Sequence, residues 1–478
     1  MKKTKIVCTM GPTTDDEAVL RQLIRSGMDV ARFNFSHGTH EEQKARMDMV
    51  KRLRDEEKKP IAILLDTKGP EIRTGLLTDG KKVMLEAGKT ITLTTEECMG
   101  TAERVSITYA GLVEDVQIGG KILIDDGLIE LKVREKTQTD IICEIVIGGE
   151  LSQHKGVNVP NVAIRLPAIT DRDREDIRFG VEQKVDFIAA SFVRNAECIL
   201  EIRAFLKECN APEIPIIAKI ENEEGLENID EIIRAADGIM VARGDLGVEI
   251  PPEELPYIQK QMIQKCNENY KTVITATQML DSMIRNPRPT RAEVTDVANA
   301  VYDGTDAVML SGETAAGKYP IEAVQMMVHI VEQAEAHLDY DGLLKKTKSY
   351  RMRSTSGALG YAAVATANHI GAKCILTPTV SGTTARTVSK FKPKMELVGV
   401  SPDARTLRRM QLYWGVRPLK SVAVATTEEI CNGAIEIAQA KGYAEAGDIV
   451  VLTAGIPSAN EGGHRTFASD MMRIATIE

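Results

Sequence analysis

The sequence has no long apolar run, few aromatic residues and no excess of positive charge. No stretch approaches the roughly 20 apolar residues that a membrane-spanning helix needs, and the first residues lead into a strand-like run without an apolar segment of signal length. The formal net charge of −9 offers no electrostatic footprint for nucleic acid or an anionic membrane. We therefore expect a cytoplasmic protein that binds neither.

Zinc-like and disulfide-like cysteine patterns are also missing. The eight cysteines are scattered and form no Cys-x-x-Cys pair, which suits small core residues in a reducing compartment. What the chain does have is length and an ordinary apolar content, with 478 residues and 43% hydrophobic residues. It can therefore form about two to four domains, each with a sizeable core.

The rhythm of the sequence predicts three units. Strand-like runs alternate with helical spacing in residues 1–74 and 168–338, and their count of about eight predicts a (β/α)8 TIM barrel. Residues 75–167 hold short strand-like runs and glycine-rich turns, typical of a small β-barrel domain inserted after the third strand, at the catalytic mouth. Residues 339–478 begin with a polar linker and predict a doubly wound α/β domain.

Polar side chains follow the apolar strand that lies in residues 214–222. Lys219 and Glu221 alternate with apolar residues, so they should share one face of the strand end. The next strand is followed by Asp245, which would bring a second carboxylate to the same rim. A single Lys–Glu pair is more often structural than chemical. Nearly every other predicted strand ends in comparable polar residues, however, which favours a site.

The strand in residues 29–36 alternates cleanly. Arg32, Asn34 and Ser36 should share one face, at the mouth of the barrel, while Phe33 and Phe35 pack on the outer helices. The same alternation should turn His37 away from the polar face, so we expect a structural role for it. The third strand ends in a second oxygen-rich cluster that begins at Asp66.

The predicted rim favours phosphoryl transfer. Glu221 and Asp245 offer the hard oxygen ligands that Mg²⁺ or Mn²⁺ prefers, and Arg32, Arg73 and Lys219 offer positive charge for phosphate oxygens. Such transfer depends mainly on positioning and on neutralising charge. Two further groups could contact a substrate: the backbone N–H groups of a turn at Gly244 and Asp245, and the hydroxyls of Thr275 and Thr277 on one face of a strand end.

Six segments carry a resemblance to a known family. They are Arg32-Phe-Asn-Phe-Ser-His-Gly38, Leu65-Asp-Thr-Lys-Gly-Pro-Glu-Ile-Arg73, Ala218-Lys-Ile-Glu-Asn222, Ala242-Arg-Gly-Asp-Leu-Gly247, Ala276-Thr-Gln-Met279 and Leu310-Ser-Gly-Glu-Thr314. All six resemble, in the same order, those of pyruvate kinase. The match covers essentially the whole chain, which is similar to bacterial members without an extra C-terminal domain.

The resemblance implies transfer of the phosphoryl group from phosphoenolpyruvate to ADP, giving pyruvate and ATP, in a homotetramer. Lys219 would stabilise the phosphoryl group in transfer, and Arg32 would bind phosphoenolpyruvate. The amides of Gly244 and Asp245 and the hydroxyl of Thr277 would contact the substrate. Glu221 and Asp245 would hold Mg²⁺ or Mn²⁺.

The resemblance also implies a potassium site and a nucleotide site. Glu71 matches members that depend on K⁺, because members that need no K⁺ carry a lysine there. Lys155, in the inserted domain, would reach the nucleotide as this domain closes as a lid, although it could equally be a solvated loop charge. The implied K⁺ ligands are Asn34, Ser36, Asp66 and Thr67, and the implied nucleotide contacts are Asn34, Arg73 and Lys155.

A loop of the C-terminal unit could bind a phosphorylated metabolite as an effector. It lies between a strand and a helix, where hydroxyls and helix amides suit phosphate, although such a loop is more often a simple helix cap. Its residues are Thr379, Ser381, Gly382, Thr383 and Thr384. The later loop at residues 455–463 lacks the Trp and Arg of eukaryotic members that respond to fructose bisphosphate, so a sugar monophosphate or AMP fits equally well.

Two other functions use parts of the same pattern. A barrel lyase or aldolase that stabilises pyruvate enolate with Mg²⁺ would need the metal carboxylates but neither Arg73 nor a lid. A catalytically silent metabolite-binding regulator would keep the fold but would be expected to lose Lys219 or a metal carboxylate, and both are present.

Overall fold

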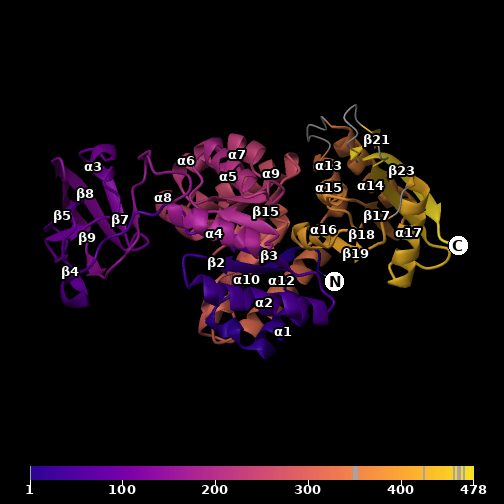
Figure 1. Cartoon of the computed structure of the whole chain (residues 1–478), viewed down its shortest axis with the longest axis horizontal. Helices are drawn as coiled ribbons and strands as arrows, with labels where there is room; N and C mark the ends of the chain where they lie inside the picture. Colours follow the sequence, from indigo (N-terminus) through magenta and orange to yellow (C-terminus); the bar gives the residue numbers. More distant parts are fainter. Residues whose placement is uncertain (1, 348–353, 424–425, 456–457, 460–464, 467–468) are drawn as a thin grey trace.

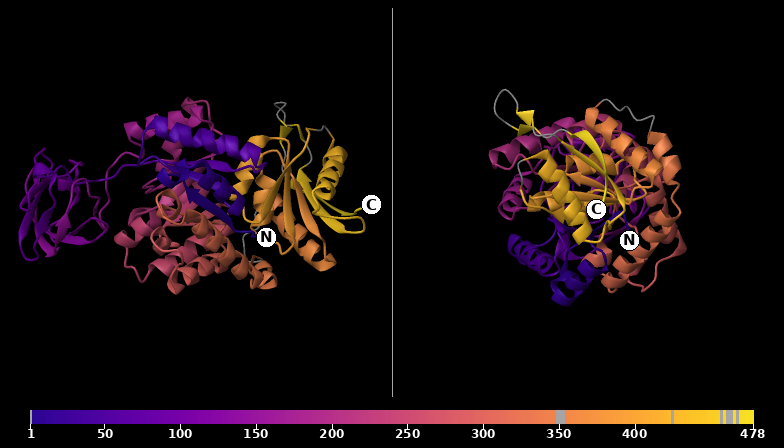
Figure 2. Two further views of the ribbon diagram at one scale, coloured as in Figure 1. Left: turned by 90° about the horizontal axis from the view of Figure 1, so that it is seen from below. Right: turned by 90° about the vertical axis from the view of Figure 1, so that its right-hand side faces the viewer.

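Three units follow one another along the long axis of the computed structural model (Figure 1). The structure describes residues 2–347, 354–423, 426–455, 458–459, 465–466 and 469–478. The inserted domain and the C-terminal domain lie at opposite ends of the central barrel (Figure 2). Among the described residues, no helix combines the length and the apolar content needed to cross a membrane.

The central unit is a closed barrel of eight parallel strands, which confirms the predicted TIM barrel. In barrel order these are β1 (Lys5–Thr9), β16 (Ala307–Leu310), β15 (Thr272–Ala276), β14 (Gly238–Ala242), β13 (Ile216–Ile220), β12 (Phe187–Ala190), β3 (Ala62–Asp66) and β2 (Val30–Asn34). Around them lie α1 (Glu17–Ser26), α2 (His40–Glu56), α4 (Asp171–Glu182), α5 (Ala196–Glu208), α7 (Ile229–Ala235), α9 (Leu255–Glu268), α10 (Arg291–Asp303) and α12 (Pro320–Ala336). Three short helices, α6 (Glu223–Glu227), α8 (Arg243–Glu249) and α11 (Gly312–Ala315), follow strands at the rim.

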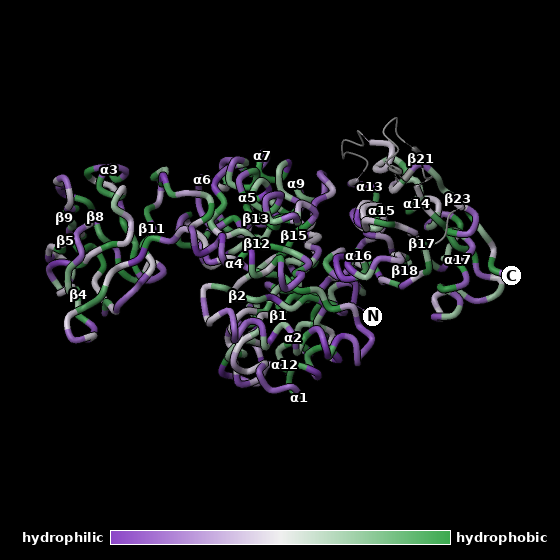
Figure 3. The backbone as a smooth tube through the Cα atoms, in the orientation of Figure 1, coloured by the Kyte–Doolittle hydropathy of each residue, from purple (hydrophilic) through white to green (hydrophobic). Residues whose placement is uncertain are grey.

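Alternation along β2 sorts its side chains between two cores. Ala31 and Phe33 belong to the core between the strands and the helices, while Val30 belongs to the core inside the barrel. Leu412, from the C-terminal domain, also belongs to the inner core. Apolar residues gather along the barrel strands in Figure 3.

The inserted domain follows β3 and has its own apolar core. Its six-stranded sheet has the order β11 (Val157–Asn158), β7 (Lys121–Ile124), β8 (Ile129–Lys136), β9 (Asp140–Ile147), β5 (Thr90–Thr94) and β6 (Arg104–Ser106). A two-stranded ribbon of β10 (Gly149–Leu151) and β4 (Val83–Leu85) and a short helix, α3 (Leu112–Asp115), complete it. Because the insertion leaves from the end of a barrel strand, it lies beside the rim.

The C-terminal domain has the predicted doubly wound character. Its sheet has the order β19 (Val416–Lys420), β18 (Glu396–Ser401), β17 (Cys374–Pro378), β20 (Ile449–Gly455) and β23 (Ser469–Thr476), and β23 alone is antiparallel to its neighbour. Its helices are α13 (Tyr340–Thr347), α14 (Thr355–Ile370), α15 (Thr383–Ser389), α16 (Ala404–Arg409) and α17 (Thr427–Ala440). A small ribbon pairs β21 (Ser458–Ala459) with β22 (Arg465–Thr466).

Candidate active site

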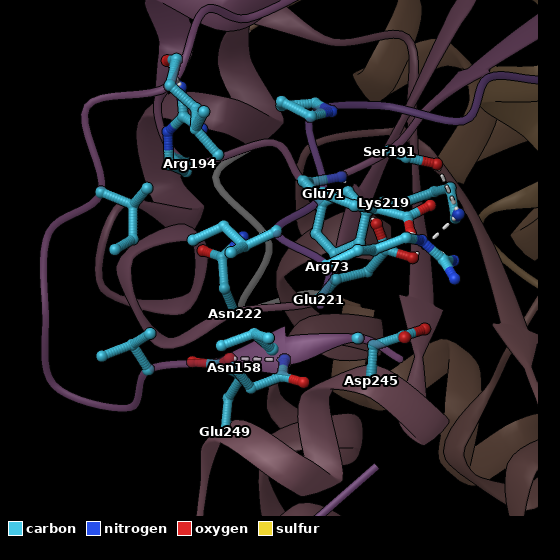
Figure 4. Close-up of a pocket in the computed structure, with 18 of the residues that line it drawn as sticks. Glu71, Arg73, Asn158, Ser191, Arg194, Lys219, Glu221, Asn222, Asp245 and Glu249 are labelled. Carbon is cyan, nitrogen blue, oxygen red and sulfur yellow. Dashed lines mark hydrogen bonds and ion pairs between the residues drawn. The ribbon is translucent and has the colours of Figure 1, made fainter. Parts of the chain in front are cut away.

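A cavity of about 690 Å³ opens between the barrel rim and the inserted domain (Figure 4). Lys219, Glu221 and Asp245 line it from the barrel, and Asp125 and Lys155 line it from the inserted domain. The polar residues that follow the predicted strands therefore line one cavity at the rim, as expected for a barrel.

Lys219 has three polar partners at this cavity, two carboxylates and one hydroxyl. Its Nζ lies 2.8 Å from Glu221 Oε1 and 3.1 Å from Asp66 Oδ1, and it donates a hydrogen bond of 2.6 Å to Ser191 Oγ. Burial by itself would lower the pKa of Lys219, but the charges of Asp66 and Glu221 outweigh it and raise this pKa above its usual value. The ammonium is therefore charged throughout the neutral range and fixed on a rigid strand end.

Glu221 is a buried carboxylate and Asp245 a half-buried one, and both have raised pKa values. Burial raises the pKa of Glu221 to about 7; Lys219 opposes this shift and the charge of Asp245 adds to it. Burial also raises the pKa of Asp245. A divalent cation would relieve the repulsion between these carboxylates, and carboxylate oxygens are the ligands that Mg²⁺ prefers. The described residues hold no group of three or more His, Cys, Asp or Glu that could bind a metal, so such an ion would take its other ligands from substrate and water.

Arg32 is held at the same rim by Asp66. The Nε of Arg32 donates to Asp66 Oδ2 over 2.6 Å, and its Nη1 donates to Thr9 Oγ1 over 3.0 Å. Burial opposes ionisation of Asp66, but Arg32 and Lys219 together hold the pKa of its carboxyl below the usual value. Asp66 thus joins two cations into one rigid, positively charged platform.

The four residues of the expected potassium site differ in exposure. Asn34 and Ser36 line the cavity, and the Ser36 N–H donates to Asn34 Oδ1 over 3.0 Å. Asp66 is fully buried and Thr67 is 3% exposed. Asn34 and Asp66 are register partners on β2 and β3, so the four residues are close neighbours at two adjacent strand ends. Their donor atoms are all oxygens, which suits a hard monovalent cation.

The position of His37 differs from the one expected from strand alternation. The strand β2 ends at Asn34, and the chain then turns, with the His37 N–H donating to the carbonyl of Asn34 over 3.4 Å. His37 lines the cavity together with Asn34 and Ser36. The expectation that it points away is therefore wrong, because period-two alternation stops where the strand stops.

Thr277 also lies beyond a strand end, and its backbone has a φ of 67°. Its hydroxyl donates to the carbonyl of Ala276 over 2.6 Å and accepts the N–H of Gly244 over 2.7 Å. The hydroxyl of Thr275 instead bonds Thr305, 2.9 Å away inside the protein. The expectation that the hydroxyls of Thr275 and Thr277 share a face is therefore wrong.

Gly244 and Asp245 stand in the first turn of α8 rather than in an open turn. The N–H of Gly244 is already bonded to Thr277 in this structure. Thr277 and Gly244 consequently form one hydrogen-bonded unit beside Asp245, at the N-terminal end of α8.

The expected nucleotide contacts line the same cavity. Arg73 pairs with Glu71 and donates from Nη1 to the carbonyl of His154 over 2.7 Å. Lys155 Nζ lies 2.8 Å from Asp125 Oδ1. The structure thus brings Arg73, Lys155 and Asn34 to the lining of one cavity, with two of the three paired to carboxylates.

Sequence reasoning missed Ser191 and the residue after it. Ser191 bonds Lys219 and donates to the carbonyl of Thr67 over 2.6 Å, while the N–H of Phe192 donates to Glu221 Oε2 over 2.6 Å. Ser191 follows directly on β12, so its position as a polar residue at a strand end was a usable signal. The hydrogen bond from the backbone of Phe192 carries no sequence signal.

The expected effector loop forms a compact turn at the start of α15. Ser381 Oγ lies 3.0 Å from Thr383 Oγ1, and the N–H of Gly382 donates to Thr379 Oγ1 over 2.9 Å. Gly382 has a φ of 84°, which favours glycine. Thr384 is buried in the first turn of α15. Of the second expected loop, residues 455–463, positions 456–457 and 460–463 lie outside the described residues.

Comparisons with known proteins show the family of the chain. Residues 1–324 match the family model of the pyruvate kinase barrel domain, and residues 357–475 match that of the pyruvate kinase alpha/beta domain. Curated pyruvate kinases from Staphylococcus epidermidis (strain RP62A) and Staphylococcus aureus (strain MRSA252) are 51% and 50% identical, over all of this chain and 81% of each relative. A crystal structure of a pyruvate kinase from Cryptosporidium parvum has a TM-score of 0.94 at 39% identity, covering 100% of this chain and 96% of that one. The chain is therefore a phosphotransferase that belongs to the pyruvate kinase family.

Proposed function

We propose that this enzyme transfers the phosphoryl group of phosphoenolpyruvate to ADP, with help from a divalent and a monovalent cation. One observation carries the proposal: the ammonium of Lys219 stands at the rim beside Glu221, and Asp66 ties it to Arg32. Fixed positive charge beside a pair of carboxylates suits a reaction whose main demand is neutralising a phosphoryl group in transfer.

Lys219 and Arg32 perform the electrostatic work in this proposal. Lys219 stabilises the equatorial oxygens of the phosphoryl group, and Arg32 holds the phosphate of phosphoenolpyruvate in line. Thr277 and the amides of Gly244 and Asp245 contact the carboxylate and enolate end of the substrate. Because the hydroxyl hydrogen of Thr277 is donated to Ala276 in this structure, it must turn before Thr277 can donate to the enolate.

Two cations complete the site in this proposal. Glu221 and Asp245 would hold Mg²⁺ or Mn²⁺, which when bound neutralises phosphate charge and orients substrate oxygens. The oxygens of Asn34, Ser36, Asp66 and Thr67 would hold K⁺, which adds positive charge near the phosphates. Glu71 supports this assignment, because family members that need no K⁺ carry a lysine at its position.

The nucleotide would bind between the rim and the inserted domain. Arg73, Lys155 and Asn34 would contact its phosphates, and the phosphates would replace Glu71 and Asp125 as the partners of Arg73 and Lys155. This corresponds to a catalytic barrel of residues 1–74 and 168–338 and a lid of residues 75–167. The contact of 2.7 Å between Asn158 and Glu249 is one that closing of the lid would remodel.

The C-terminal domain would regulate the enzyme, and the enzyme would act in the cytoplasm. Residues 339–478 would form a regulatory domain that binds a phosphorylated metabolite at Thr379, Ser381, Gly382, Thr383 and Thr384, within a homotetramer. A cytoplasmic location is supported by the eight cysteines, which are all free thiols.

A coupled assay tests the central reaction. Consumption of phosphoenolpyruvate that requires ADP and yields pyruvate and ATP in equal amounts is expected. Consumption without ADP would instead indicate a lyase, and no consumption with any divalent cation would refute the proposal.

A further inference from the structure

The turn that carries Asn34, Ser36 and His37 is fixed from below by one buried side chain. Gln43, on the first turns of α2, is 3% exposed, and its Nε2 donates to the carbonyl of Asn34 over 3.1 Å and to that of His37 over 2.8 Å. Both hydrogens of a single amide group thus join the two ends of the turn. No other side chain among the described residues makes a hydrogen bond to both carbonyls.

The orientation of the Gln43 amide follows from these two acceptors. If the amide were reversed, Oε1 would face two carbonyl oxygens and repel both of them. In the orientation observed, Oε1 is buried and has no hydrogen-bond partner in the described structure. An unsatisfied buried acceptor destabilises a fold, so at this position an apolar side chain of the same size would avoid that cost. Compared with such an apolar side chain, a glutamine adds the two hydrogen bonds that it donates to the carbonyls of Asn34 and His37.

Other contacts hold the middle of the turn, between the two carbonyls that Gln43 binds. The carbonyl of Phe35, between the two clamped residues, accepts from Arg172 over 3.1 Å, and the N–H of Phe35 donates to the carbonyl of Asp66 over 2.9 Å. Gly38 closes the turn with a φ of 77°, and a Cβ there would lie 3.5 Å from Gln43 Nε2. With its carbonyls held by α2 and α4, the turn presents Asn34, Ser36 and His37 to the cavity.

We propose that Gln43 is a positioning residue that sets the affinity of the Asn34–Ser36 turn for a monovalent cation and for the nucleotide phosphates. This inference rests on the proposed function, which gives Asn34 and Ser36 to the cation and Asn34 to the nucleotide. Gln43 itself does not line the cavity, so it acts through the backbone of the turn.

The test compares two variants with a control on the same helix. Gln43→Met keeps the length of the side chain but donates nothing, and Gln43→Glu keeps the polar shape but cannot donate when ionised. Val50→Ala shortens another buried side chain of α2 without removing a contact to the turn, so it controls for loss of helix stability. Thermal unfolding first establishes that each variant is folded.

Two readouts are combined, one of them independent of turnover. Hydrogen exchange of a peptide covering residues 33–39 should become faster in both Gln43 variants and stay unchanged in Val50→Ala. The K⁺ concentration for half-maximal rate, and the K⁺ dissociation constant from calorimetry, should rise about tenfold in both variants. The KM for ADP should rise too, while the rate at saturating K⁺ and ADP should change less.

Unchanged exchange and unchanged K⁺ affinity in a folded Gln43→Met variant would overturn the inference. If the unsubstituted enzyme shows no K⁺ dependence at all, the cation part of the proposed function fails instead. In that case the exchange rate of the turn and the KM for ADP decide whether Gln43 positions the turn, and unchanged values of both would overturn that as well.

Discussion

The ammonium of Lys219 lies 2.8 Å from the carboxylate of Glu221, its neighbour but one along the chain. Lys219 lies within β13 and Glu221 directly follows its last residue, so the end of this strand brings the two side chains together. Glu221 is additionally held by the N–H of Phe192, and Lys219 by Ser191. The charged groups to which we assign the phosphoryl transfer are therefore positioned by a strand end and its hydrogen-bonded neighbours.

The raised pKa of Glu221 should make the affinity for the proposed divalent cation depend on pH. Because this pKa is about 7 in the folded protein against 4.5 ordinarily, the stability that the group contributes is complete below pH 4.5 and is lost as pH rises through 7. A divalent cation needs the ionised form and should reverse that loss. We expect Mn²⁺ to bind about tenfold more weakly at pH 6 than at pH 8, measured by calorimetry.

Glu221→Gln provides the control for this pH dependence. The variant should bind Mn²⁺ weakly at both values of pH, because the titrating ligand is gone. Equal Mn²⁺ affinity of the unsubstituted protein at pH 6 and pH 8 would show that Glu221 is not the ligand that titrates.

Glu71 should make the enzyme depend on K⁺. When K⁺ is replaced by tetramethylammonium, we expect the rate to fall about tenfold or more, because positive charge near the phosphates is lost. Glu71→Lys, which supplies an ammonium, should retain more of its rate without K⁺. Glu71→Gln also breaks the pair with Arg73 but adds no cation, so it should stay dependent. Full activity of the unsubstituted enzyme without K⁺ contradicts this prediction.

Asp306 should be a stability determinant between the barrel and the C-terminal domain. It is fully buried, pairs with Lys390 and lies 3.2 Å from Lys392, both of the C-terminal domain. Asp306→Asn would leave two buried ammonium groups without their counter-ion. We expect a loss of about 3–5 kcal/mol in the free energy of unfolding, measured by urea titration.

An exposed ion pair is the comparison for Asp306. Lys44 and Asp48 pair on the surface of α2, with side chains about half exposed. Asp48→Asn should cost less than about 1 kcal/mol. Equal losses of unfolding free energy for the two substitutions would mean that the ion pairs of Asp306 do not stabilise the contact between the barrel and the C-terminal domain.

Sequence patterns predicted the fold and the strand ends well, for a physical reason. Apolar runs of strand length and helical spacing report burial directly, and side chains at parallel strand ends must converge on one rim, as Lys219, Glu221 and Asp245 do. Arg32 and Asn34 were equally accessible to this reasoning, because they lie within β2.

Patterns failed where the chain leaves a strand. His37 and Thr277 follow the last strand residue, and a turn or a positive φ overrides alternation there. The partners of Asp66 are Arg32 of β2, Ser191 after β12 and Lys219 of β13, which the fold alone brings together. The pairing of Arg73 with Glu71 depends on side-chain conformation. Gln43 was invisible for the same reason, since only the folded turn brings two carbonyls to its amide.

The most direct test of the account is the Lys219→Met variant, in a coupled assay with phosphoenolpyruvate and ADP. Lys132→Met, which replaces an exposed lysine of the inserted domain, is the matched control. We expect Lys219→Met to lower the rate by at least about 10³-fold while phosphoenolpyruvate still binds, because fixed charge is lost where charge develops during transfer. Undiminished formation of ATP by Lys219→Met would contradict the central claim that this ammonium stabilises the phosphoryl group in transfer.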